Sequence, residues 1–337
     1  MNGKPQAAQA LVEATDLAKT FDVSAPWLNR VIERKPRLLL HAVDGVSFSI
    51  EKGKTLALVG ESGCGKSTVA RLLVGLYQPT RGSLNFDGHD VHAALQTPQG
   101  NPLRRRIQMI FQDPYASLNP RWTVEDIVGE PLQEHGLIAD AAQRRQRVAE
   151  LLLSVGLSTV DMAKYPHQFS GGQRQRISIA RALGTEPDFL VCDEPTSALD
   201  VSVQAQVLNI MKDLQRERGL TYLFISHNLA VVRHVSDQVG VMYLGRMVEL
   251  AGKHTLFDNP RHPYTRMLLD AIPKMRDTGR ARTPVSGEVP NPLEPPAGCA
   301  FHPRCPHANS RCSAERPQMV SQGLARVACH AVEEGRI

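Results

Sequence analysis

The sequence predicts an α/β protein with a largely parallel sheet, on two observations. Short apolar segments that fit buried strands recur at residues 55–59, 189–192 and 222–225, and each is followed by polar loop residues. Helical patterns stand between these segments, at residues 66–76 and again within 123–185. Strands that alternate with helices are typical of a parallel sheet with helical crossovers.

The chain of 337 residues exceeds one typical domain, and its composition changes near residue 257. Beyond that point proline and cysteine become frequent and the strand and helix patterns fade. We therefore expect a main domain over residues 1–257, with a helical subdomain at about 115–185. A Pro- and Cys-rich extension over residues 258–337 should follow it.

Composition excludes several classes of protein. Hydrophobic residues make up 42% of the chain and charged residues 22%, which is ordinary for a globular protein with a sizeable core. The net charge of +5 is mild, and the long basic runs of a nucleic-acid binder are missing. The N-terminus lacks the apolar core of a secretory signal, and no segment approaches the ~18 apolar residues that span a bilayer. We expect a cytoplasmic protein.

Residues 60–68 read Gly-Glu-Ser-Gly-Cys-Gly-Lys-Ser-Thr and fit the phosphate-binding pattern G-x-x-x-x-G-K-[ST], hereafter the P-loop. The pattern lies after a buried strand and before a helix, where backbone N–H groups and the helix N-terminus attract phosphates. We expect Lys66 to reach the β- and γ-phosphates and the Ser67 hydroxyl to bind Mg²⁺. The Cys64 side chain fits a small filler better than a nucleophile. The predicted nucleotide contacts in the loop are Gly60, Ser62, Gly63, Cys64, Gly65, Lys66, Ser67 and Thr68.

Two acids, Asp193 and Glu194, end the apolar segment 189–192. Asp193 is predicted to help hold Mg²⁺, and Glu194 to orient or deprotonate the attacking water. An adjacent Asp-Glu pair on its own is most often a solvated strand end. Together with the P-loop it indicates a nucleotide site.

Residues 169–173, Phe-Ser-Gly-Gly-Gln, resemble the LSGGQ signature of ABC ATPases, with Phe in place of the common Leu. The segment opens a helical pattern at 174–183, so its amides should lie at a helix N-terminus that suits a second contact to a γ-phosphate. The predicted contacts are Ser170, Gly171, Gly172 and Gln173.

Further elements of the family pattern follow in order. Gln112 resembles the Q-loop glutamine that senses Mg²⁺ and the attacking water, Asp200 lies in a segment like the D-loop, and His227 resembles the switch histidine that contacts the γ-phosphate. Phe21 is a candidate for the aromatic that stacks on adenine, with a core phenylalanine as the alternative. The resemblance implies catalytic roles for Lys66, Gln112, Glu194 and His227, and Mg²⁺ ligation by Ser67, Gln112 and Asp193.

The resemblance covers about residues 11–257 and implies a P-loop NTPase fold. In that fold a RecA-like parallel sheet carries an antiparallel β subdomain and a helical subdomain. The family's ATP site is composite, because the signature of a second subunit closes over the P-loop of the first. One P-loop and one signature therefore imply a second ABC ATPase subunit, identical or homologous, and homologues are usual in the branch described next.

Segments 111–120, 259–265 and 299–305 resemble the oligopeptide/dipeptide importer branch. This implies an ATP-hydrolysing subunit that energises uptake of di- or oligopeptides through two integral membrane permease subunits, supplied by an extracytoplasmic solute-binding protein. The chain would then lie on the cytoplasmic face of a bacterial inner membrane. Nickel or another small solute is an alternative cargo. A soluble ABC ATPase of DNA repair or translation is disfavoured because no long insert separates P-loop and signature.

Four of the six cysteines lie in the extension, at Cys299, Cys305, Cys312 and Cys329, with the spacing C-x5-C-x6-C-x16-C. Disulfides are disfavoured in the cytosol, so clustered cysteines indicate metal binding or redox chemistry, although this spacing matches no regular zinc or ferredoxin pattern. The resemblance implies a [4Fe–4S] cluster. Zinc, with a nearby histidine as a substitute ligand, and four reduced thiols are the alternatives; the histidines are His302, His307 and His330.

Overall fold

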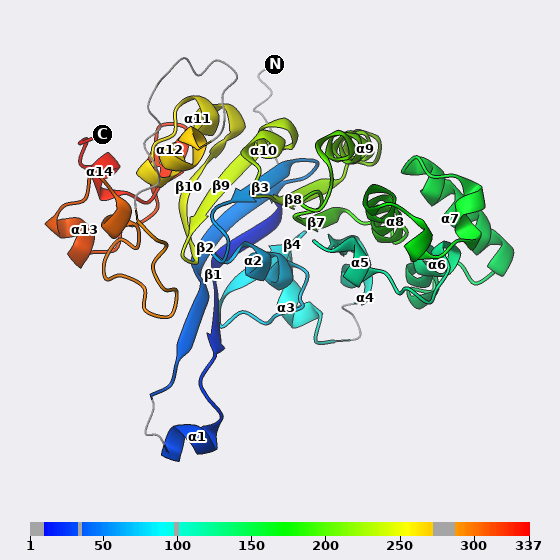
Figure 1. The fold of residues 1–337 in the computed structure, drawn as a ribbon, viewed down its shortest axis with the longest axis horizontal. Coiled ribbons are helices and arrows are strands. Elements are labelled where there is room, and N and C mark those ends of the chain that lie inside the picture. Colours follow the sequence, from blue (N-terminus) through cyan, green and yellow to red (C-terminus); the bar gives the residue numbers. More distant parts are fainter. Residues whose placement is uncertain (1–9, 33–35, 98–100, 272–286) are drawn as a thin grey trace, which may run out of the picture.

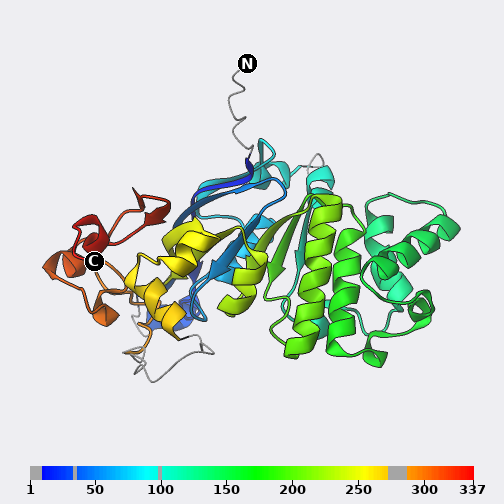
Figure 2. The same ribbon diagram turned by 90° about the horizontal axis from the view of Figure 1, so that it is seen from above.

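The computed structural model describes residues 10–32, 36–97, 101–271 and 287–337. Within these ranges the strands form two sheets, a central one of eight strands and a smaller one of four (Figure 1). The helical region and the C-terminal extension lie at opposite ends of the molecule (Figures 1 and 2). No helix in the described ranges has the length and apolar character that crossing a bilayer needs.

The central sheet has a parallel core, as predicted. Three of its strands are buried along their whole length, which fits their continuous apolar sequence. The core strands are β3 (Thr55–Val59), β6 (Ile107–Ile110), β7 (Phe189–Asp193), β8 (Thr221–Ile225) and β9 (Gln238–Tyr243). The pairs β6–β7, β7–β8, β8–β3 and β3–β9 are parallel, so the carboxyl ends of these strands share one edge of the sheet.

The smaller sheet is antiparallel, with the order β2-β1-β4-β5, and matches the β subdomain that the resemblance implies. Its strands are β1 (Ala10–Asp22), β2 (Leu39–Glu51), β4 (Arg81–Phe86) and β5 (His89–Asp90). The β1–β2 hairpin extends away from the body and carries α1 (Trp27–Ile32) near its tip, where Trp27 is 68% exposed (Figure 1).

Helices cover the sheet and form the helical region. Those of the N-terminal half and the helical region are α2 (Lys66–Leu73), α3 (Val91–Ala94), α4 (Asn101–Arg106), α5 (Pro114–Ser117), α6 (Val124–Glu134), α7 (Ala141–Ser154), the 3-10 helices Thr159–Ala163 and Pro166–Gln168, and α8 (Gly171–Leu183). After β7 and β8 come α9 (Val201–Arg218) and α10 (Leu229–Val235).

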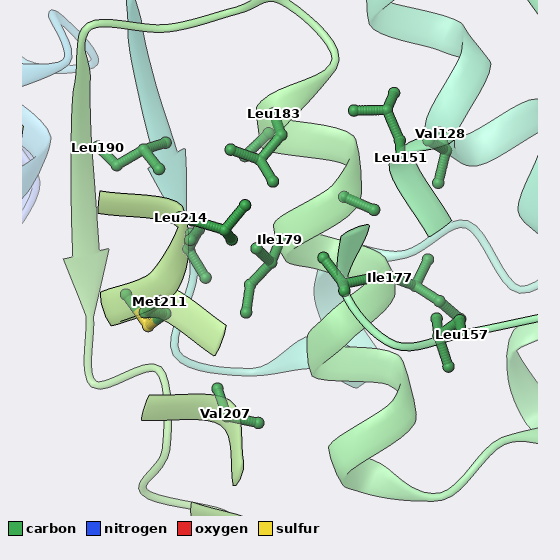
Figure 3. Packing of buried hydrophobic residues seen from close by; sticks show 14 of the residues in the cluster. Val128, Leu151, Leu157, Ile177, Ile179, Leu183, Leu190, Val207, Met211 and Leu214 are labelled. Atoms are coloured by element: carbon green, nitrogen blue, oxygen red, sulfur yellow. The ribbon is translucent and has the colours of Figure 1, made fainter. Parts of the chain in front are cut away.

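One apolar cluster connects the helical region to the sheet through α8. Ile179 and Leu183 of α8 lie between Val128 of α6 on one side and Leu214 of α9 on the other, and all four are buried (Figure 3). The helix that begins at the signature is therefore packed against both parts of the molecule, and its N-terminus is fixed relative to the strand ends.

The extension adds strands to the central sheet. β12 (Ala325–Val327) pairs antiparallel with β10 (Arg246–Gly252), and β11 (Val320–Gln322) pairs with β12. The remaining elements are α11 (Lys253–Asp258), α12 (Pro263–Asp270), the 3-10 helix His302–Arg304, α13 (Ser310–Ala314) and α14 (His330–Glu333). A separate apolar cluster joins them to β9 and β10, so the extension shares a core with the sheet edge.

Candidate nucleotide-binding site

The P-loop leaves β3 and enters α2 at Lys66. Gly60 and Gly65 have φ values of +149° and +104°, which L side chains rarely adopt. A Cβ at Gly60 would overlap the carbonyl of Met242, and one at Gly65 would overlap that of Ala42. Both contacts are with backbone, which cannot move aside, so these positions require glycine.

The Lys66 ammonium is buried and folded back into the loop. It donates hydrogen bonds to the carbonyls of Gly60 (2.8 Å) and Glu61 (3.0 Å), and its side chain is 6% exposed. A buried cation whose partners are neutral carbonyls is well placed to attract an anion. Cys64 lies beside it, with Sγ 3.6 Å from the Lys66 Nζ, and burial raises the pKa of this thiol, which keeps it neutral.

A hydroxyl and a carboxylate meet where β7 ends. Ser67 Oγ donates to Asp193 Oδ1 at 3.0 Å, and Asp193 is 4% exposed. Burial raises the pKa of Asp193, the Ser67 hydrogen bond lowers it, and the charge of Glu194 raises it further. Oxygen ligands of this kind are those that Mg²⁺ prefers, and a cation would relieve the cost of burying the carboxylate. The pair fits a magnesium ion.

Glu194 receives two side chains from neighbouring strand ends. Gln112 Nε2 donates to Glu194 Oε2 at 3.1 Å from beyond β6, and His227 Nδ1 lies 3.1 Å from the same oxygen, from beyond β8. The Glu194 backbone has a φ of +46°, strained for a non-glycine residue, and its N–H donates to the Ile225 carbonyl. Parallel pairing thus brings two of the predicted residues, Gln112 and His227, to the carboxylate of a third, Glu194.

The signature segment forms a capped helix N-terminus. Ser170 and Gln173 make a capping box, in which each side chain accepts a hydrogen bond from the other's backbone N–H, at 3.4 and 3.0 Å. Gly172 is buried against Val203, where a Cβ would collide with the valine side chain. Among the described residues, no hydrogen bond or ion pair joins residues 169–173 to the P-loop.

The last two predicted contacts have less defined surroundings. Asp200 is exposed at the N-cap of α9 and makes no capping bond with its side chain. Phe21 is only partly buried, which argues against a core phenylalanine, and its ring stands edge-on to Tyr77 at 5.3 Å. The Lys19 ammonium lies 5.3 Å from the ring centre of Phe21. The role of Phe21 in adenine stacking stays a prediction.

The sequence analysis missed two residues of the extension that contact the P-loop. Arg304 pairs with the Glu61 carboxylate, and the Tyr264 hydroxyl accepts from the Glu61 N–H. Both lie in segments singled out above for family resemblance. No spacing rule connects these two segments to a loop more than 200 residues earlier in the chain.

The predicted metal centre of the extension is not supported by this structure. Cysteines 299, 305, 312 and 329 lie near one another, and burial, followed by the neighbouring cysteines, raises the pKa of Cys299 to about 11. Yet no group of three or more His, Cys, Asp or Glu side chains within the described ranges is placed to hold a metal ion, so neither the [4Fe–4S] nor the zinc hypothesis gains support from it. Two of the possible substitute ligands bond to backbone instead, His302 with the Cys299 carbonyl and His330 with that of Glu315.

Comparison with known proteins agrees with this geometry. Residues 43–197 match the family model described as ABC transporter, and residues 248–312 match the model described as oligopeptide/dipeptide transporter, C-terminal region. The chain is 50% identical to the oligopeptide transport ATP-binding protein AppF of Bacillus subtilis, covering 96% of this chain and 97% of the relative. It is 51% identical to the dipeptide transport ATP-binding protein DppF of Escherichia coli, covering 97% and 96%.

Solved structures show the same fold. A dimeric post-hydrolysis state of the ATP-binding cassette MJ0796, bound to ADP and phosphate, superposes with a TM-score of 0.63 at 27% identity, covering 72% of this chain and 98% of that one. The cbiO1 protein of Clostridium perfringens, part of the transporter complex cbiONQ, gives a TM-score of 0.62 at 26% identity, covering 74% and 91%.

Proposed function

This chain belongs to the ATP-binding proteins of ABC transporters, and from that membership we propose that it hydrolyses ATP to drive uptake of di- or oligopeptides through separate membrane subunits. The observation that carries the chemistry is the convergence of Gln112 and His227 on the Glu194 carboxylate, beside the Ser67–Asp193 pair. Peptide as cargo is supported by the match of the C-terminal segment and by the relatives, which favour it over nickel, another small solute or a soluble ATPase.

The proposed mechanism assigns each group a step. Lys66 and the P-loop amides bind the β- and γ-phosphates. Ser67 and Asp193 would hold Mg²⁺, which would supply positive charge to neutralise the phosphates. Glu194 orients the attacking water and accepts its proton, and Gln112 and His227 hold the carboxylate in position. The products are ADP and phosphate.

The proposed ATPase partner follows from the presence of one P-loop and one signature in the sequence. A second ATPase subunit, identical or homologous, supplies its own signature to the γ-phosphate of this P-loop, and residues 170–173 of this chain do the same for the partner. Two integral membrane permease subunits and an extracytoplasmic solute-binding protein complete the transporter, with this chain bound peripherally on the cytoplasmic face of a bacterial membrane. ATP would close the ATPase pair and hydrolysis would reopen it.

Reconstitution tests this proposal. The chain is co-expressed with the permease, ATPase and binding-protein genes of its own cluster, and ATP hydrolysis by the purified complex in liposomes is measured with a dipeptide, an oligopeptide mixture and Ni²⁺. Stimulation by peptide that is absent with Ni²⁺ supports peptide import. Stimulation by Ni²⁺ alone, or hydrolysis that needs no membrane partner and responds to DNA or ribosomes, would contradict it.

An iron–sulfur cluster on the four tail cysteines, with zinc as the alternative, is a separate proposal. The proximity of the thiols supports it. Anaerobic purification followed by iron, sulfide and zinc analysis decides the matter. About four irons per chain would mean a cluster, about one zinc a zinc site, and neither would mean four reduced thiols.

A further inference from the structure

The P-loop residue Glu61 is bound by the C-terminal extension through its carboxylate. The Arg304 guanidinium donates to both carboxylate oxygens, at 2.8 and 3.0 Å, a bidentate pair that fixes the carboxylate in direction as well as distance. The Arg304 side chain is 3% exposed and that of Glu61 25%, so the guanidinium is buried and the carboxylate is partly shielded from water. The same carboxylate raises the pKa of Arg304 above its ordinary range.

A second contact holds the Glu61 backbone. Its N–H donates to the hydroxyl of Tyr264, on α12, at 2.9 Å. Tyr264 is fully buried, with its ring 4.7 Å from that of Tyr243 and 5.4 Å from that of Phe301. An aromatic side chain packed on two sides cannot follow a moving loop, so it fixes the position of the N–H.

The remaining polar group of Glu61 faces the catalytic lysine. Its carbonyl accepts from Lys66 Nζ at 3.0 Å, so the residue lies between the extension and the group expected to bind phosphate. The Glu61 carboxylate also carries a negative charge beside a site for a polyanion. Pairing with Arg304 neutralises that charge and holds it away from the phosphates.

We propose that Arg304 and Tyr264 are positioning residues that hold the P-loop in its phosphate-binding shape, so that affinity for ATP depends on the folded C-terminal extension. The inference rests on the proposed ATP function. It adds to that function a role of the extension in nucleotide binding, and this role does not depend on metal binding by the four tail cysteines.

The test measures ATP binding and hydrolysis by the full-length chain. Arg304→Gln should raise the Kd and KM for ATP about tenfold, a coupling within the range of residues in direct contact, because it leaves the Glu61 carboxylate unpaired next to the phosphates. The kcat should change less than about twofold, because Glu194, Gln112 and His227 are untouched. Tyr264→Phe should raise the Kd by a smaller factor, about threefold, because it removes one neutral hydrogen bond and keeps the ring.

Two further variants separate positioning from general stability. Arg311→Gln is the matched control, because Arg311 is a tail arginine that pairs with Glu315, Glu333 and Glu334 and has no bond to the P-loop among the described residues. Its Kd should equal that of the wild type. The double variant Glu61→Gln/Arg304→Gln should bind ATP more tightly than Arg304→Gln alone, because removing the carboxylate removes the unpaired charge.

The outcomes divide cleanly. Wild-type affinity in Arg304→Gln overturns the inference, and so does an equal loss in Arg304→Gln and Arg311→Gln, which would show only that the extension stabilises the fold. Failure of the double variant to recover affinity overturns the electrostatic part. If Arg304→Gln does not fold, the Kd and KM for ATP are measured on two milder variants instead, Arg304→Lys and Tyr264→Phe. Arg304→Lys keeps the charge but loses the bidentate geometry. A wild-type chain that binds no ATP overturns the proposed function itself.

Discussion

The strand-end site and the C-terminal extension are built by different means. At the strand ends, parallel pairing joins side chains that are 82 residues apart in the Gln112–Glu194 contact and 33 apart in the His227–Glu194 contact. In the extension, the 3-10 helix His302–Arg304 and the aromatic packing of Phe301 beside it place Arg304 against Glu61, which is 243 residues away in the chain. Contacts between the ends of parallel strands can be predicted from a sequence, because the strand pattern indicates which residues share an edge of the sheet. The contact of Arg304 with Glu61 depends on tertiary packing, which the sequence pattern does not indicate.

Lys66→Ala should have the largest effect and acts at the strand-end site alone. It removes the buried ammonium that faces the phosphates, so both affinity and transition-state stabilisation are lost. We expect turnover to fall more than about 10³-fold. Steady-state ATPase assays and nucleotide titration measure the two losses. Lys52→Ala, an exposed lysine before β3, is the control. Hydrolysis within tenfold of the wild type would remove Lys66 from the mechanism.

Glu194→Gln should separate binding from chemistry at the same site. The amide keeps the shape of the side chain but accepts no proton, so hydrolysis should fall about 10²- to 10³-fold while ATP still binds. The ATPase pair should then stay closed, which gel filtration with and without ATP detects. The exposed Glu217→Gln on α9 is the control. Normal hydrolysis in the assembled complex would show that another group acts as the base.

The sequence predicted the parallel core, the P-loop and the two acids at the end of β7, because each depends on local pattern and on the shared edge of parallel strands. It could not predict the pairing of β12 with β10, since more than 70 residues separate the two strands in the chain. In the extension, the four cysteines drew attention because clustered cysteines indicate metal binding or redox chemistry. The residue that contacts the P-loop is Arg304, next to Cys305, and a single arginine in a proline-rich segment does not indicate a contact of that kind.

The smallest predicted effect is a pH dependence of stability that arises from His262, the N-cap residue of α12, two residues before Tyr264. This histidine is fully buried. Its Nδ1 accepts from the Tyr264 N–H, and its ring donates to the carbonyl of Ala328. Burial lowers the pKa of His262 to about 3, against an ordinary value of 6.5, so the folded state keeps the ring neutral where the unfolded chain protonates it. Stability is therefore lost as the pH falls through 6.5 towards 3.

Between pH 7.5 and 5.5 this linkage should lower the free energy of unfolding by about 1.4 kcal/mol. Urea unfolding of wild type and His262→Gln at both pH values isolates it, because the variant lacks this titration and should show a pH dependence smaller by that amount. His254→Gln, an exposed histidine on α11, should keep the wild-type dependence. Equal pH dependence in wild type and His262→Gln would mean that the ring can be protonated without unfolding, and that the packing around His262 and Tyr264 yields to a buried charge. Packing that yields there would hold Tyr264 less firmly against Glu61, so Tyr264→Phe should then change the Kd for ATP by less than about threefold.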